Sequence, residues 1–286
     1  MPLCAEMNLL RLPQIVIEKE IVMNVKVDLI GVPFDLGGGR SGARYGPDAL
    51  ICSGIIENLA MVGISSRYQN LRVRGEIREA FDTTRVARGK VHYEHEVAQV
   101  VRLVSVHTFA SLRHGHIPVV LGGDHSISIG SVGAALHPEF LRGRTFGLVW
   151  IDAHLDAHTH LTTPSRRAHG LPLATLLGYG PRKLLECIHS VTPSSYAGRR
   201  IRVRSMLSPA NVIHVGCGDD HCESEEYEFF EKYHIPQFSR KYLQNEGWLN
   251  LRDSLRKLCD RVDCLWVSLD LDSIDRSIAP GVLYPN

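Results

Sequence analysis

The segment that decides the fold is FGLVWIDAHLDAH, residues 146–158. It opens with a continuous apolar run, Phe146 to Ile151, which is typical of a parallel strand covered on both faces. The run ends at Asp152, and His154 and Asp156 follow at intervals of two residues. Ligands of open α/β sheets bind beyond the carboxyl ends of the strands, so these polar side chains lie where chemistry is expected.

Four more runs of the same character are spread along the chain: Val27 to Val32, His116 to Leu121, Asn211 to Gly216 and Cys264 to Leu269. Segments typical of helices alternate with them, among them His92 to His114 and Leu249 to Cys259. This alternation predicts a three-layer α/β fold, a doubly wound parallel sheet flanked by helices, in one domain over residues 1–286. The segment Tyr68 to Lys90 has the weakest pattern, and we expect it to be a surface excursion.

The composition of the chain excludes several classes of protein. Of its 286 residues 44% are hydrophobic, enough for a large core, so an intrinsically disordered chain is excluded. Lys and Arg number 32 against 31 Asp and Glu, a balance that argues against a nucleic-acid binder. No stretch approaches the roughly 20 apolar residues of a membrane span, and the N-terminus lacks the pattern of a secretory signal.

The cysteines are seven in number, scattered along the chain and without a CxxC pair: Cys4, Cys52, Cys187, Cys217, Cys222, Cys259 and Cys264. Neither a disulfide framework nor a zinc ribbon is indicated. We therefore expect reduced thiols in a cytoplasmic protein.

Six candidate metal ligands follow the predicted strands: His125, Asp152, His154, Asp156, Asp270 and Asp272. In an extended chain residues two and four apart point the same way, so the members of each segment are expected to converge. Four carboxylates brought together would repel one another, and divalent cations remove that conflict. Carboxylates with two imidazoles suit Mn²⁺ or Fe²⁺/Co²⁺, and bridging carboxylates favour two metals that share one water or hydroxide.

Each motif taken alone also has a purely structural interpretation. An isolated Asp-x-His is commonly a surface or capping feature, and the DLD motif at residues 270–272 is often only a helix cap. The GGDHS motif could be a turn with Asp124 or Ser126 as the N-cap of a helix. The metal site is the favoured interpretation because all of these motifs stand at strand ends.

The same motifs resemble a known family. The segments GGDHSISIGS, WIDAHLDAH and SLDLDSIDRSIAPG look like the three signature blocks of the arginase/agmatinase (ureohydrolase) family, and GVPFDLGGGRSGARYGPDAL looks like its N-terminal block. The resemblance covers Val27 to Gly281. It implies a parallel sheet flanked by helices and a dinuclear manganese centre that hydrolyses a guanidinium group and usually releases urea.

The resemblance also implies roles for individual residues. One manganese would be held by His125, Asp152, Asp156 and Asp270, and the second by Asp152, His154, Asp270 and Asp272. Asp156 would also orient the attacking water and pass its proton onward. His169, in the run RRAHG, is similar to the family's proton-shuttle histidine, although by itself it would be interpreted as a structural histidine at a helix start.

The loop from Asp156 to Gly170 has the length seen in arginases rather than agmatinases. By resemblance, Ser165 would help to bind the α-carboxylate of an amino-acid substrate, whereas His158 and Arg167 replace two asparagines. Arg166 stands where a glycine is common. After the fourth strand Asp219 keeps its family position near the α-amino group, and either Glu223 or Glu225 could replace the next acid. These comparisons make His158, Ser165, Arg167 and Asp219 the candidate substrate-binding residues.

These observations predict an arginase-like enzyme that converts arginine to ornithine and urea, as a homo-oligomer (trimer or hexamer). The alternatives are an agmatinase, a guanidino-acid hydrolase, a formimidoylglutamase, or a catalytically impaired member that acts as a metal-binding or regulatory subunit. Family members continue beyond the Asp270 block with a helix, a strand and a glutamate that binds the guanidinium group, whereas this sequence stops at Asn286. We therefore expect a C-terminally incomplete chain that retains its metal ligands and handles substrate poorly.

Overall fold

A computed structural model describes residues 25–71, 86–188, 207–218 and 222–282. Its first sheet consists of three parallel strands in the order β2-β1-β3. They are β1 (Lys26–Gly31), β2 (Ser65–Asn70) and β3 (Ile117–Leu121). Helices α1 (Gly46–Cys52) and α2 (Ile55–Met61) lie between β1 and β2 in the chain, and α3 (Glu94–Arg113) precedes β3.

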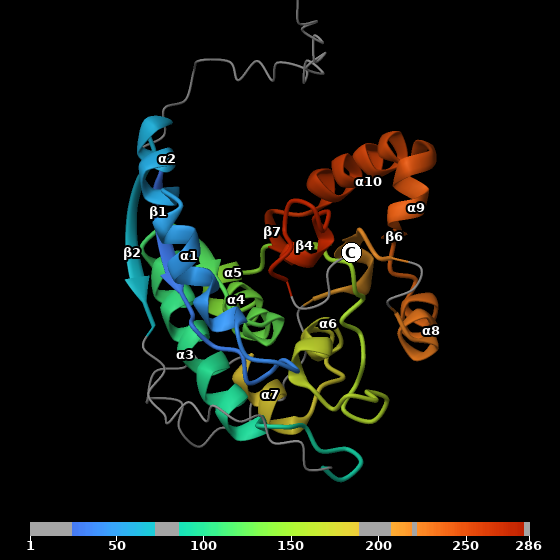
Figure 1. Ribbon diagram of the computed structural model, residues 1–286. Helices are drawn as coiled ribbons and strands as arrows, with labels where there is room; N and C mark the ends of the chain where they lie inside the picture. The colour runs from blue at the N-terminus through green and yellow to red at the C-terminus, as the bar shows by residue number, and fades with distance from the viewer. Residues whose placement is uncertain (1–24, 72–85, 189–206, 219–221, 283–286) are drawn as a thin grey trace, which may run out of the picture.

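The second sheet has four parallel strands in the order β6-β5-β4-β7. They are β4 (Phe146–Ile151), β5 (Val212–Val215), β6 (Gln237–Phe238) and β7 (Cys264–Leu269). The helices after β3 are α4 (Ser128–Ala135), α5 (Pro138–Leu141), α6 (Pro172–Leu176), α7 (Arg182–Cys187), α8 (Ser224–Tyr233), α9 (Arg240–Tyr242) and α10 (Trp248–Arg261). Figure 1 shows β1 and β2 with α1–α3 on one side of the molecule and the second sheet with α8–α10 on the other.

One apolar core joins the two sheets. Ile30 of β1, Val101 of α3, Val132 of α4 and Trp150 of β4 all belong to a single cluster of buried side chains. Helix α4 is buried along its whole length, since every one of its residues is shielded from solvent. The sheets are therefore held together by helices packed on both.

The predicted parallel α/β class is confirmed, and all five predicted strands are present. Two strands were not predicted. Strand β2 is polar and only half buried, and β6 has two residues, so neither contains an apolar run. The prediction of a surface excursion from Tyr68 was wrong at its start, because β2 extends to Asn70; residues 72–85 lie outside the described part. The strands form two sheets, since β3 and β7 do not pair among the described residues.

Strand β2 is tied to β1 by a buried carboxylate. Asp28 and Arg67 are register partners, and the Arg67 guanidinium donates to both Asp28 oxygens, at 2.5 and 2.9 Å. His116 Nδ1 lies 3.1 Å from the same carboxylate. Burial by itself would raise the pKa of Asp28, but the hydrogen bonds, that from Arg67 foremost, outweigh it and lower the pKa to about 2.

Asp28→Asn is expected to lower the free energy of unfolding at pH 7 by about 1–3 kcal/mol, because it removes a buried charged acceptor from the Arg67 guanidinium. The pKa of Asp28 is about 2 in the folded chain against an ordinary 3.8, so its contribution is complete above pH 3.8 and is lost as the pH falls toward 2. Urea unfolding of both chains at pH 7 and at pH 3 measures the difference. Asp253→Asn, at an exposed pair with Arg252, is the control and should change little.

Candidate metal centre

Strand register brings two of the candidate acids side by side. Ile151 at the end of β4 pairs with Leu269 at the end of β7, and the Asp270 amide donates to the Ile151 carbonyl at 2.8 Å. The next residue of each strand is therefore an aspartate, Asp152 beside Asp270. The Asp152 amide is itself held by the Val215 carbonyl of β5, at 2.9 Å.

The histidine that completes this group comes from the other sheet. Gly123 follows β3 and passes so close to the chain after β1 that a Cβ there would lie 1.6 Å from the Phe34 carbonyl oxygen. The Asp124 amide donates to that same oxygen at 2.9 Å, and the Asp124 carboxylate caps the short helix His125–Ile127 by accepting from the Ser126 amide. A glycine is therefore required where these two segments cross. The crossing places His125 beside Asp152 at the end of β4 in the second sheet.

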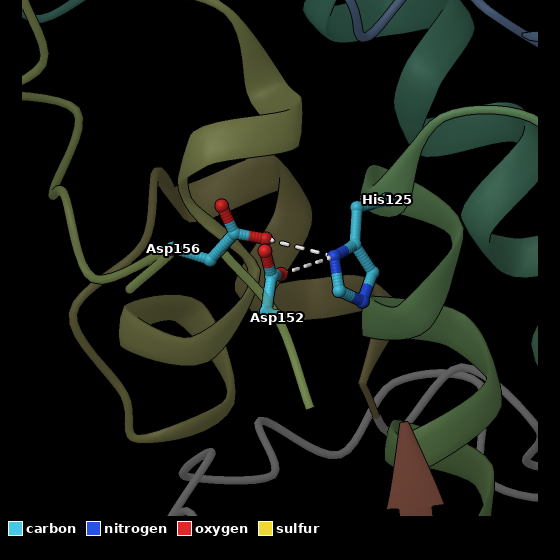
Figure 2. Close-up of side chains that lie close together, drawn as sticks. All are labelled: His125, Asp152 and Asp156. Carbon is cyan, nitrogen blue, oxygen red and sulfur yellow. Dashed lines mark ion pairs between the residues drawn. The ribbon is translucent and has the colours of Figure 1, made fainter. Parts of the chain in front are cut away.

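His125 is surrounded by carboxylates. Its Nδ1 lies 2.9 Å from Asp152 Oδ2, 3.0 Å from Asp156 Oδ2 and 3.1 Å from Asp270 Oδ2. Figure 2 shows Asp152 and Asp156 both directed at this nitrogen. Three acids from two strand ends thus converge on one imidazole.

A second group adjoins the first through Asp152. His154 Nδ1 lies 2.9 Å from Asp272 Oδ2 and 3.5 Å from Asp152 Oδ1. The two oxygens of Asp152 therefore face different groups, one with His125 and Asp156 and the other with His154 and Asp272. All six candidate ligands predicted from the sequence lie in these two adjoining groups.

The ring of His125 is held in place from its far side. Its Nε2 lies 2.9 Å from Ser268 Oγ, and the ring stacks on Trp150 with 4.4 Å between centroids. The Trp150 indole N–H donates to Asp152 Oδ2 at 3.1 Å. Histidine ligands are commonly oriented by such a bond at the second ring nitrogen. This arrangement leaves Nδ1 as the nitrogen directed at the acids.

The predicted cause of convergence was wrong, although the residues do meet. Residues 152–156 lie beyond β4, with a bend at Ala153 and His154, and Asp156 has a left-handed backbone with φ of 50°. Asp270 and Asp272 are joined by a tight turn in which the Asp272 amide donates to Asp270 Oδ1 at 3.1 Å. Turns, rather than the two-residue alternation of a strand, direct these side chains inward. The capping interpretation of the DLD motif is therefore also correct, since Asp270 caps the turn and faces His125.

The charges in the two groups are mutually dependent. Burial opposes charge on His154, yet its hydrogen bonds to Asp152 and Asp272 raise its pKa to about 11. The pKa of His125 is likewise raised despite burial, by its three carboxylate neighbours. Burial, with the charge of Asp152, raises the pKa of Asp156 to about 7 and that of Asp272 to about 6. Without bound metal, protons on these imidazoles and carboxyl groups therefore offset the negative charge of the clustered aspartates.

This donor set fits divalent cations. A single N–H on His125 cannot serve three carboxylates, and both His125 Nδ1 and Asp156 Oδ2 are buried without a well-formed hydrogen bond. A cation between the acids and Nδ1 would satisfy these atoms and take the place of the protons. Carboxylates with imidazole are ligands suited to Mn²⁺ and similar ions.

His169 lies on the short helix Ala168–Gly170, and its amide donates to the Gly37 carbonyl at 3.0 Å. Burial lowers the pKa of His169 to about 4, and the charge of His154 adds to this effect. The imidazole is therefore neutral near pH 7, in the form that can accept a proton.

The candidate substrate residues lie in different surroundings. His158 is buried, and its Nε2 lies 3.0 Å from Glu223 Oε2 and 3.6 Å from Glu226 Oε2. Ser165 is exposed, and its Oγ accepts from the Arg167 amide of its own loop at 3.3 Å. Asp219 lies outside the described residues.

Glu226 is a buried acid that sequence reasoning missed. It accepts from the Ala157 amide at 3.0 Å, and burial raises its pKa to about 8. With Glu223 it forms a capping box at the start of α8. The spacing of the two glutamates, with the second three residues after the first, is the signal that could have revealed it.

A cavity of about 420 Å³ borders the loop that follows Asp156. Its lining includes Arg88, His160, Arg166 and Glu225. Arg166 adopts a left-handed backbone, φ 55°, which is uncommon for a residue with a side chain. Arg166, and not Arg167, is among the residues that line this cavity.

Within the described part of the chain, none of the helices combines the length and apolar character needed to cross a membrane.

Comparisons with known proteins agree with this geometry. The chain is 31% identical to an arginase of Brevibacillus brevis over 265 residues, which cover 92% of this chain and 80% of that protein. It superposes on the solved structure of an arginase from Bacillus caldovelox with a TM-score of 0.76 at 27% identity, covering 92% and 81% of the two chains. An arginase structure from Bacillus cereus gives a TM-score of 0.75, also at 27% identity, with 91% and 80% covered. The model of the arginase family matches residues 25–286, and the chain belongs to that family.

Proposed function

We propose that this protein is a dinuclear manganese hydrolase that cleaves a guanidino carbon–nitrogen bond, most specifically that of arginine, to give ornithine and urea. The observation that carries the proposal is the position of Asp152, whose two oxygens face two adjoining groups of acids and imidazoles. Membership of the arginase family supports the same reaction.

In this proposal each ion would have four ligands. His125, Asp152, Asp156 and Asp270 would hold the first ion, and Asp152, His154, Asp270 and Asp272 would hold the second. Asp152 and Asp270 would belong to both sets. Their position at the paired ends of β4 and β7 supports that role.

When bound, the two ions supply positive charge that polarises a shared water molecule and lowers its pKa. Asp156 would orient that water through its carboxylate and pass its proton onward. Water oxygen adds to the guanidinium carbon, the bond from that carbon to the substrate side chain breaks, and the departing nitrogen leaves as an amine. His169, neutral in its partly buried position, carries a proton toward that nitrogen.

The far end of the substrate would meet His158, Ser165, Arg167 and Asp219. The contact of His158 with Glu223 supports a site for an α-amino group, because this acid, whose pKa is lowered despite burial by its hydrogen bond to His158, would offer negative charge to a cation. We further propose a cytoplasmic homo-oligomer, a trimer or hexamer, which light scattering of the purified protein would test.

The reaction is tested by loading the protein with Mn²⁺ and measuring urea or ammonia released from arginine, agmatine, guanidino acids and formimino compounds. We expect about two ions per chain and the fastest release of urea from arginine. Bound metal with no release from any compound would instead support a metal-binding or regulatory subunit. Absence of metal from a folded chain would contradict the proposal altogether.

The cations of the substrate loop lead to a prediction about substrate charge. Arg166 and Arg88 line the cavity of about 420 Å³ beside the loop after Asp156. If the substrate's far end reaches this cavity, a carboxylate should be favoured there and the cationic tail of agmatine disfavoured. Replacing both Arg166 and Arg167 by Ala should reduce the preference for arginine over agmatine by about 10-fold or more, because a change of this size corresponds to the loss of one charge-assisted hydrogen bond. The ratio of kcat/KM for the two substrates measures it. Agmatine as the better substrate of the unsubstituted protein would contradict this prediction.

A further inference from the structure

Two cysteines face each other beside the candidate metal centre. Cys217 lies two residues after β5, and Cys222 immediately precedes Glu223, the N-cap residue of α8. Their Sγ atoms are 2.8 Å apart. The other cysteines that the structure describes have no sulfur partner of this kind; Cys187, for example, donates to the Lys183 carbonyl.

Each cysteine is held in place by a different part of the fold. The Cys217 carbonyl accepts from the Arg240 amide at 3.0 Å, and the following Gly218 amide donates to the Ala153 carbonyl at 3.1 Å. Cys222 is held by the start of α8, whose capping box joins Glu223 to Glu226. The two sulfurs therefore meet because hydrogen bonds after β5 hold Cys217 in place and the start of α8 holds Cys222 in place.

We propose that Cys217 and Cys222 form an oxidisable dithiol, a site of reversible disulfide formation next to the segment that carries Asp152 and His154. The sulfurs are closer than an ordinary non-bonded contact, and a disulfide bond of about 2.0 Å needs them to approach by less than about 1 Å. The oxidant in this proposal is a low-molecular-weight disulfide such as oxidised glutathione.

Exposure determines the order of the steps. Cys222 is partly exposed and Cys217 is buried, so the Cys222 thiolate attacks the external disulfide and releases one glutathione thiolate. The Cys217 thiolate then attacks the Cys222 sulfur and releases the second. Two electrons pass from the cysteine pair to the external disulfide, and the two thiol protons end on the two glutathione molecules.

The hydrogen bond between the sulfurs bears on the two steps differently. It lowers the pKa of Cys217, which favours the thiolate needed for the second attack. It raises the pKa of Cys222, so exchange with the external disulfide is expected to be the slow step.

The test uses the full chain equilibrated with mixtures of reduced and oxidised glutathione, followed by alkylation of the remaining thiols and peptide mass mapping. Cleavage after Lys and Arg places both cysteines, and no others, on one peptide from Ser205 to Lys232. We expect this peptide to lose about 2 Da and both alkylation sites as the oxidised fraction rises, and to regain them with dithiothreitol. The exposed Cys52 and Cys259 should stay alkylated at the same ratios.

Cys222→Ser is the matched variant. It should abolish the mass loss, and the rise in melting temperature that oxidation gives the unsubstituted chain should disappear with it, because a cross-link restricts the unfolded chain. If Cys217 and Cys222 remain alkylated at every glutathione ratio, or if either ends as a stable mixed disulfide with glutathione, the proposal is wrong. Both results are obtained without substrate or metal, so they are independent of the hydrolase assay.

Discussion

Asp152→Asn is expected to abolish metal loading and, with it, urea release. The substitution replaces one of two oxygens that face two different groups, so one proposed ion loses its ligand atom and the other keeps only a neutral amide oxygen. Changing a residue that only orients a ligand commonly costs 10–100-fold in metal affinity, and loss of a shared ligand should cost about 100-fold or more. Elemental analysis after Mn²⁺ loading, together with calorimetric titration, measures the effect.

Two variants separate loss of metal from loss of stability. Asp28→Asn removes another buried carboxylate, one on β1 whose partners Arg67 and His116 are not candidate ligands, and should destabilise the chain while metal content stays unchanged. Trp150→Phe removes the indole N–H that donates to Asp152 and should lower metal affinity by the intermediate 10–100-fold. Full metal content in folded Asp152→Asn would show that the shared position of this residue has been misinterpreted.

His169→Ala is expected to lower kcat by about 10²–10⁴-fold without changing metal content. The partly buried, neutral imidazole is proposed to carry a proton to the departing nitrogen, and alanine offers no group for that transfer. Stopped assays of urea release at saturating arginine measure kcat, and added imidazole should restore part of the lost rate.

The control for this variant is His107→Ala on α3, since burial also lowers the pKa of His107 but its Nδ1 faces Gln69, away from the metal centre. Its kcat should remain close to that of the unsubstituted protein. If His169→Ala lost metal, or if imidazole failed to restore any rate, the histidine would have a structural role instead.

Much of the candidate site was predictable because local sequence encodes it. The runs Phe146 to Ile151 and Cys264 to Leu269 match β4 and β7 residue for residue. Both runs are apolar, and the first acid after each marks where the strand ends, although only β4 is buried as expected: Leu265, Val267 and Leu269 of β7 are exposed. Asp152 and Asp270 could therefore be placed at the carboxyl edge of the sheet from the sequence alone.

The capping-box spacing marks Glu226 as a residue at a helix start, but neither its place in the site nor the contact of the two cysteines has a local signal. Glu226 lies within a helix of ordinary polar composition, and it reaches the site only because α8 packs against the segment after β4. The contact between Cys217 and Cys222 depends on how the end of β5 and the start of α8 are anchored, which the spacing of the cysteines does not express.

By itself, then, the sequence determined which residues end strands, and hence which acids and histidines share one edge of the fold. The tertiary structure decided that β4 pairs with β7 and that His125 reaches them from the other sheet. It also decided that bends, with a left-handed Asp156, turn the acids onto two imidazoles. The physical reason is that hydrophobic patterning records the burial of each residue, whereas the distance between remote segments is set by strand order and register, which equally apolar runs do not distinguish.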